Sequence, residues 1–183
     1  GIPFVVDASL LADNLHFIKT REKACMDMSL REITKKISDL SDVIYWSARK
    51  LGHVRGGGII TNNEKYFKDI LEMLPLYEGF STYGGMSVRE MEAMAIGLEE
   101  TMDEQMVNQG PIFIEYMVNE LLKLGIPVVT PPGGLGVHLD AMKFLEHVPQ
   151  EQYRSGSLGA ALFIASGVRG MERGTISEDR EED

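Results

Sequence analysis

Apolar residues form two different patterns in the first part of the chain, continuous runs and a helical repeat. Residues 2–7, IPFVVD, form a continuous apolar run that ends in an aspartate, a pattern typical of a strand buried on both faces of a parallel sheet. In residues 28–40, MSLREITKKISDL, the apolar side chains recur at helical spacing. Residues 42–47, DVIYWS, again have the composition of a strand. The pattern therefore predicts a strand, a crossover helix and a second strand.

Polar residues mark the ends of these predicted elements. Ser29 and Glu32 have the spacing of a capping box and support the start of the crossover helix. Asp7 ends the first strand, and residues 47–50, SARK, lie at the end of the second. Open α/β sheets bind their ligands at the carboxyl ends of their strands. We therefore expect Asp7 and residues 47–50 at one ligand-binding edge.

Further strand and helix signals continue to about residue 102. Residues 56–61, GGGIIT, predict a third strand, and residues 64–74 predict a helix that is stopped by Pro75. A glycine-rich loop follows. Ser87 and Glu90 then form a second capping-box pair, which predicts the start of another helix.

The pattern changes in the second half of the chain. A longer helix is expected to end at Gly125, with a kink or a fresh start at Gly110 and Pro111. Short apolar runs separated by prolines and glycines in residues 126–141 predict strand, turn and strand. Residues 157–167, SLGAALFIASG, predict a short helix.

These elements predict an α/β chain with two parts. Residues 1–102 are expected to be part of a large domain with a mostly parallel sheet, and residues 103–183 an interdomain helix and the start of a smaller α+β domain. The closing acidic run, residues 177–183, predicts a solvated segment.

The charge and cysteine content limit the partners and the compartment. The chain has 28 acidic and 18 basic residues and a formal net charge of -10. Nucleic acids and anionic membranes bind basic surfaces, so small molecules or other protein chains are the expected partners. No apolar run is long enough to span a bilayer, and Cys25 is the only cysteine, so a cytoplasmic protein without an internal disulfide is predicted. The four histidines have no metal-ligand spacing, so no metal site is predicted from them.

The side chains expected at the sheet edge suit pyridoxal phosphate. This cofactor needs a lysine to hold its aldehyde as a Schiff base, a carboxylate to keep its ring nitrogen protonated, and donors for its phosphate. Lys50, Asp7 and Ser47 could supply these groups in turn. Arg49 beside the lysine would favour a neutral amine or bind phosphate.

Spacing alone leaves other interpretations of this edge open. A lysine after a strand is usually a solvated loop residue, and an aspartate ends strands in many nucleotide-binding and metal-binding α/β proteins. A Walker-type phosphate loop is disfavoured, because the chain has no G-x-x-x-x-G-K-[ST] motif.

Longer sequence tracts resemble a known family. Residues 47–50, SARK, residues 78–98, EGFSTYGGMSVREMEAMAIGL, and residues 167–174, GVRGMERG, occur in the order seen in the aromatic amino acid β-eliminating lyases, the family of tryptophanase and tyrosine phenol-lyase. Asp7 with Ala8 and residues 17–19, FIK, fit the same pattern. The resemblance covers essentially the whole chain, and the tract at 78–98 is far more specific than a four-residue motif.

The resemblance implies a partial fold-type I pyridoxal phosphate enzyme with a transferase-like large domain. Such an enzyme would convert tyrosine or tryptophan to pyruvate, ammonia and phenol or indole. By position, Lys50 corresponds to the Schiff-base lysine, Ser47 to a phosphate ligand and Asp7 to the partner of the ring nitrogen. Arg49 stands where the family usually has another lysine.

Substrate-side positions both match and depart from the family. Tyr83 matches an active-site tyrosine, and Arg173 resembles the arginine with which the phenol-lyases recognise the phenol hydroxyl. Leu10 stands in place of an arginine and Leu135 in place of a histidine. A charged donor has become apolar at both positions, which affects the expected protonation of the leaving group and the choice of substrate.

The resemblance also implies a cation and further protein segments. The family binds a monovalent cation near the position of Arg55, so K⁺ is an expected cofactor unless the guanidinium takes its place. Family members are longer and form tetramers with shared active sites. We therefore expect a homo-oligomer, a partner chain that supplies missing segments, or an excerpt of a longer protein. The alternative function is a noncatalytic or split-subunit remnant that serves as a binding or scaffold module.

Overall fold

The computed structural model describes residues 1–83 and 85–173. The chain divides into two compact units, Gly1–Ile112 and Phe113–Asp183. The predicted solvated segment at 177–183 lies outside the described residues. The assignment of residues 1–102 to a cofactor domain stays a prediction.

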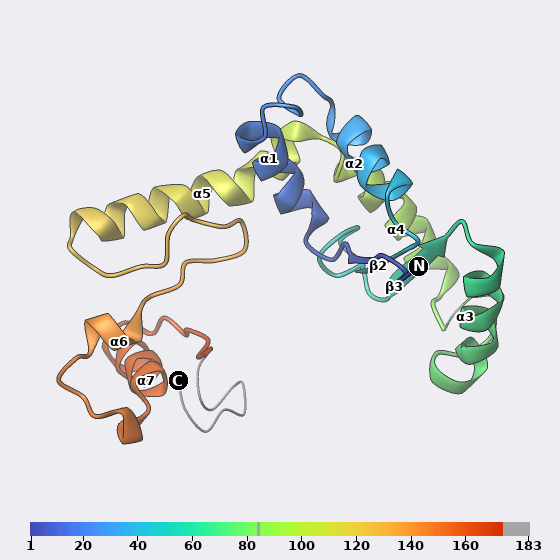
Figure 1. The fold of residues 1–183 in the computed structure, drawn as a ribbon. Helices are drawn as coiled ribbons and strands as arrows, with labels where there is room; N and C mark the ends of the chain where they lie inside the picture. The colour runs from blue at the N-terminus through green and yellow to red at the C-terminus, as the bar shows by residue number, and fades with distance from the viewer. Residues whose placement is uncertain (84, 174–183) are drawn as a thin grey trace. The chain divides into compact units, whose positions relative to one another are not determined.

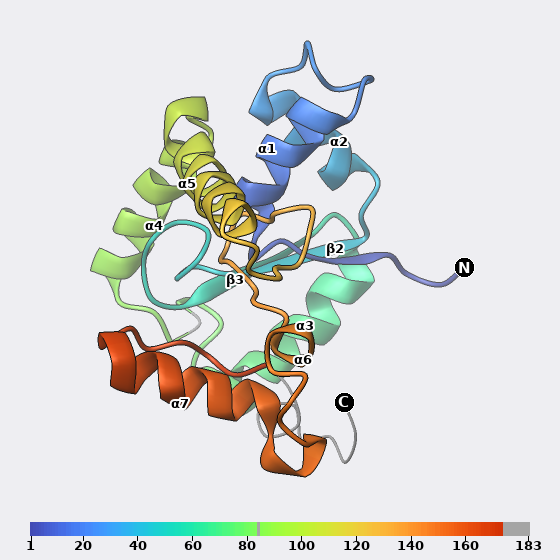
Figure 2. The same ribbon diagram turned by 90° about the vertical axis from the view of Figure 1, so that its left-hand side faces the viewer.

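A three-stranded sheet forms the centre of the first unit (Figures 1 and 2). Its strands follow the order β1 (Val5–Asp7), β2 (Val43–Ser47) and β3 (Gly57–Thr61). β1 pairs with β2 in parallel, with Asp7 opposite Tyr45, and β2 pairs with β3 in antiparallel orientation. The predicted strands are present, and the ends of β1 and β2 lie at the same edge as expected. The expectation of a mostly parallel sheet is wrong for these strands, because β3 follows β2 through a short turn and pairs with it in antiparallel orientation.

Helices lie on both sides of this sheet. α1 (Leu11–Arg21) and α2 (Leu30–Asp39) connect β1 to β2 and lie above the strands in both views, whereas α3 (Glu64–Tyr77) lies below them (Figures 1 and 2). α4 (Val88–Glu100) and α5 (Glu104–Lys123) follow in the chain. The capping boxes predicted at the starts of α2 and α4 are both present.

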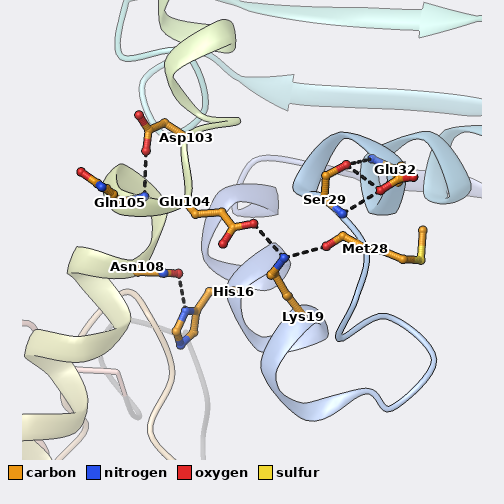
Figure 3. Close-up of polar contacts among 9 residues, drawn as sticks. All are labelled: His16, Lys19, Met28, Ser29, Glu32, Asp103, Glu104, Gln105 and Asn108. Atoms are coloured by element: carbon orange, nitrogen blue, oxygen red, sulfur yellow. Dashed lines mark hydrogen bonds and ion pairs between the residues drawn. The ribbon is translucent and has the colours of Figure 1, made fainter.

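The main hydrophobic core of the first unit joins α1, α2 and the start of α5. Its buried residues are Leu15, Leu30, Ile33 and Val107. Polar contacts at the edge of this core hold the same elements together (Figure 3). Lys19 Nζ donates to the carbonyl oxygen of Met28 at 2.7 Å and pairs with Glu104 Oε1 at 2.7 Å.

The second unit is built from short elements. After the end of α5, Val128 and Leu139 form one isolated antiparallel bridge. α6 (Ala141–Phe144), the 3-10 helix η1 (Gln150–Gln152) and α7 (Arg154–Ser166) follow. α7 ends at Gly167, whose φ of 74° permits the left-handed conformation of a helix C-cap.

Several details of the sequence prediction are wrong. Residues 2–7 are not buried on both faces, because Phe4 and Val5 are about half exposed while Ala8 is buried. α3 continues through Pro75 to Tyr77. The proline removes one hydrogen bond of the helix, but the N–H groups of Glu78 and Gly79 both donate to Leu74 O at 2.9 Å, and the chain turns at Gly79, with φ 130°. α5 is one helix with Pro111 inside it, so the alternative of a fresh start is wrong, and a kink at Gly110 and Pro111 stays a prediction.

Two further observations concern the second half of the chain. The strand pair expected at 126–141 is reduced to a single bridge. Apolar side chains in α5 and directly after it are largely exposed, as Phe113 and Leu124 illustrate. Among the described residues, no helix combines the length and the apolar character needed to cross a membrane.

Candidate functional site

The end of β1 holds the Asp7 carboxylate in a tight turn. The backbone N–H of Ser9 donates to Asp7 Oδ1 at 2.9 Å, a side-chain turn that aspartate commonly forms with the residue two positions ahead. Ser9 Oγ in turn accepts the backbone N–H of Ser47 at 3.0 Å. Ser9 therefore links the carboxylate at the end of β1 to the serine at the end of β2.

The segment after β2 is a compact turn, residues 47–56. Leu51 N–H donates to Ser47 O at 3.0 Å, and Ala48 N–H donates to Gly56 O at 2.9 Å. Ala48 and Leu51 are buried, whereas Arg49 and Lys50 are exposed. The apolar residues anchor the turn and leave the two cations accessible.

Close packing on α4 fixes this turn. Gly97 lies so near to Gly52 that a Cβ on Gly97 would meet the Gly52 carbonyl oxygen at 2.0 Å. Gly52 has a φ of 102° and is covered by the side chains of Met94 and Leu98. Two glycines at this crossing allow the backbone after Lys50 to approach the helix.

A cavity of about 770 Å³ lies beside the same strands in the first unit. Its polar lining includes Ser47, Arg49, Arg55 and Tyr83, and α3 supplies an apolar wall. Tyr45 and Glu90 also line the cavity. The cavity brings together two strand ends, the glycine-rich loop and the start of α4.

Hydrogen bonds and charges keep Asp7 ionised. The pKa of Asp7 lies below its ordinary value because Ser9 hydrogen-bonds to the carboxylate, with further contributions from the Tyr45 hydroxyl and the charge of Lys50. The charge of Asp7, together with burial and the hydrogen bond, raises the pKa of Tyr45. The site therefore contains a carboxylate acceptor beside a protonated phenol donor.

The cap of α4 has a comparable effect on Glu90. Hydrogen bonds from Ser87 lower the pKa of Glu90, and the charges of Arg55 and Arg89 add to this shift. The start of α4 thus presents an ionised carboxylate to the cavity beside a guanidinium.

The structure brings most of the predicted site residues to one region. Ser47, Arg49 and Tyr83 share the cavity, while Asp7 and Lys50 lie at the adjoining strand ends. Arg173 is exposed and belongs to the second unit, after the end of α7.

The positions that depart from the family have different surroundings. Leu10 is the residue before α1 and supplies no side-chain cap. Leu135 is 65% exposed in the second unit. Arg55 lines the cavity and contributes its charge to Glu90.

Sequence reasoning missed Ser9 and Tyr45. The D-A-S spacing after β1 is a signal for the turn that Ser9 forms with Asp7. Tyr45 could be found only from the strand register, which places it opposite Asp7. Within residues 1–83 and 85–173, no cluster of three or more histidine, cysteine or acidic side chains could hold a metal ion.

Comparison with known proteins identifies relatives along the whole chain. The chain is 39% identical over 182 residues to a protein named tyrosine phenol-lyase from Clostridium tetani, covering 99% of this chain and 40% of the relative. It is 37% identical to a tryptophanase from Salinibacter ruber, covering 100% of this chain and 39% of the relative. A probable β-eliminating lyase from Trichomonas vaginalis is also 37% identical, with 98% and 39% covered. No protein-family model matches the chain.

These comparisons confirm the predicted resemblance. The structure is an α/β chain with a small mixed sheet, and its sequence is homologous to curated proteins named tyrosine phenol-lyase, tryptophanase and β-eliminating lyase. The chain spans about 40% of the length of these relatives.

Proposed function

We propose that this chain is part of a pyridoxal phosphate-dependent lyase that eliminates the aromatic group from an L-amino acid. The observation that carries the proposal is the convergence of Asp7, Ser47 and Lys50 at one edge of the sheet. The homology to lyases supports the reaction class. In this proposal the first unit corresponds to part of a fold-type I cofactor domain.

The donor set at this edge fits the cofactor. A ring nitrogen that carries a proton needs an ionised acceptor, and the lowered pKa of Asp7 meets that need. Ser47 and Arg49 line the cavity and would contribute a hydroxyl and a positive charge toward the phosphate. The exposed Lys50 amine would bind the cofactor aldehyde.

Each of these residues would have a separate role in the reaction. When bound, pyridoxal phosphate supplies an electron sink for the substrate α-carbon. Asp7 would orient the cofactor ring, and the Lys50 amine would take the α-proton. Tyr83 borders the cavity and is the candidate active-site tyrosine, while Arg173 is the candidate determinant for the aromatic group.

A monovalent cation is a further part of the proposal. K⁺ would bind near Arg55 unless the guanidinium takes its place. The proximity of Glu90 to Arg55 supports replacement of the ion, because the carboxylate already has a cationic neighbour. Activity that rises steeply with added potassium would contradict this replacement.

The expected partners are an amino-acid substrate and further protein segments. Exposed apolar side chains on β1 and β3, such as Val5 and Ile59, support an assembly with another copy or with a partner chain. The single cysteine, Cys25, supports the expectation of a cytoplasmic enzyme.

The experiment that tests this function measures pyruvate released by the purified chain with pyridoxal phosphate and L-tyrosine or L-tryptophan. We expect pyruvate from the natural chain and none from Lys50→Ala, because the substituted side chain has no amine. Lys65→Ala, at an exposed position of α3, is the matched control and should keep the activity.

A noncatalytic remnant that acts as a binding or scaffold module is the second candidate. Leu10 and Leu135 favour it, because both stand where the resemblance implies a charged or polar donor. A folded chain that binds the cofactor at Lys50 but releases no pyruvate from either amino acid would support this alternative.

A further inference from the structure

Tyr45 occupies a position that neither the homology nor the sequence motifs single out. It lies on β2 directly opposite Asp7 of the parallel strand β1. Residues paired across neighbouring strands project from the same face of the sheet, and the strands lie about 5 Å apart. The phenol of Tyr45 is therefore long enough to reach over the Asp7 carboxylate.

The backbone also ties these two residues together. Ala8 N–H donates to Tyr45 O at 2.8 Å, so the peptide that follows Asp7 is fixed to the tyrosine. Ser47, two residues further along β2, lies on the same face as Tyr45 and is linked through Ser9 to Asp7. Tyr45 thus lies among Asp7, Ser9 and Ser47 and also borders the cavity.

The protonation states are complementary. The groups that act on Asp7 are Ser9 from the turn after β1, Tyr45 from β2 and Lys50 from the turn after β2. The pKa of Asp7 is lowered and that of Tyr45 is raised. Near neutral pH the phenol is therefore the donor and the carboxylate the acceptor.

We propose that Tyr45 is a positioning residue for Asp7, whose hydroxyl donates to the carboxylate and aims it at a protonated ring nitrogen of a bound cofactor. A carboxylate offers about four lone-pair sites. The Ser9 bonds and the Tyr45 hydroxyl fix its orientation and leave acceptor capacity for one more N–H. The identity of that N–H rests on the proposed function, whereas the position of Tyr45 opposite Asp7 does not.

Replacement of Tyr45 by phenylalanine isolates the role of the hydroxyl. Tyr45 is 42% exposed, so removing one oxygen changes little packing. Tyr77→Phe is the matched control, because Tyr77 is an exposed tyrosine on α3 and does not line the cavity.

The test is a titration of the Asp7 carboxyl carbon by NMR in the full chain without cofactor. We expect an upward shift of the Asp7 pKa in Tyr45→Phe and no shift in Tyr77→Phe. A parallel pH titration of the visible absorbance of bound pyridoxal phosphate should move in Tyr45→Phe as well, which a purely structural role would not cause. An unchanged Asp7 pKa in Tyr45→Phe would overturn the proposal.

The two arms of this experiment separate the positioning role from the proposed function. If the Asp7 pKa shifts but the chain binds no pyridoxal phosphate, the proposed function is wrong and the pair of Tyr45 and Asp7 stands only as a contact. If the cofactor binds but the Asp7 pKa does not respond to Tyr45→Phe, the proposed function stands and the positioning role is wrong.

Discussion

The turn at residues 47–56 and the segment at residues 126–140 are both glycine-containing connections, but they are held very differently. In the first, Ala48 and Leu51 are buried and the backbone is hydrogen-bonded within the turn. In the second, the backbone makes one bridge, and Leu135 is 65% exposed.

The glycines of the two segments show the same contrast. Gly52 and Gly97 are in close contact, so neither has room for a side chain. Gly133 and Gly136 have no atom of the described residues within 4 Å of an added Cβ. The conformation around Lys50 is therefore determined by packing within the first unit, and the conformation around Leu135 depends on few contacts of its own unit.

The largest expected effect is a difference in stability between alanine substitutions of two leucines, one in each segment. Leu51→Ala should destabilise the first unit by roughly 2–5 kcal/mol, because it removes a buried side chain and leaves a cavity beneath the turn. Leu135→Ala should change stability by less than about 0.5 kcal/mol, as is usual for exposed positions. Amide hydrogen exchange followed by peptide reports each unit separately. Equal losses of protection in the two variants would contradict the contrast.

A pair of helical glycines gives the next largest effect. Gly97→Ala should cost about 1–3 kcal/mol, because its Cβ would displace the Gly52 backbone. Gly159→Ala in α7 is the matched control, since an added Cβ there meets no described atom within 4 Å. The free energy of unfolding of this control should rise by up to about 1 kcal/mol, because alanine has a higher helix propensity than glycine. Denaturant unfolding measures the stability of Gly97→Ala through the fluorescence of Trp46 and that of Gly159→Ala through helical circular dichroism. A more stable Gly97→Ala variant would show that packing on α4 does not fix the turn.

The smallest expected effect concerns two carboxylates at helix starts, Glu90 in the capping box of α4 and Asp140 at the N-cap of α6. The pKa values of Glu90 and Asp140 are both lowered, first by hydrogen bonds from Ser87 and from Lys143 respectively. A lowered pKa in the folded state gives a stabilisation that is present above the unfolded-state pKa and is lost as the pH falls through the folded-state pKa.

We therefore expect Glu90→Gln and Asp140→Asn to be less stable than the natural chain near neutral pH and equal to it in acid. The Asp140 effect should be the smaller one, because α6 has only four residues to support. Unfolding curves recorded across the acidic range check both changes. A stability difference that grows on acidification would reverse the assigned sign.

Local signals explain which elements could be predicted. β1, β2 and α2 follow from apolar periodicity and from a capping box. α1 was missed although Leu11, Leu15 and Ile18 recur at helical spacing, because Leu10 gives no side-chain cap to mark its start. Pro75 was misleading because the helix continues two residues past it and is closed by the N–H groups of Glu78 and Gly79, which donate to Leu74 O.

The site could be predicted only in part for a similar reason. Asp7 and residues 47–50 are recognisable because each follows a strand, and parallel strands share their carboxyl edge. The roles of Tyr45 and the cavity depend on register and on packing between segments from β2 to the start of α4. Neither interaction has a signature in any single stretch of sequence.

The central claim is that the ends of β1 and β2 form a pyridoxal phosphate site with Lys50 as its covalent attachment point. The most direct measurement adds the cofactor to the purified chain, reduces with borohydride and locates the adduct by peptide mass. The account predicts label on Lys50 that disappears in Lys50→Ala and falls in Gly97→Ala. A folded chain with no label on Lys50, or with label spread equally over surface lysines such as Lys65 and Lys68, would contradict it.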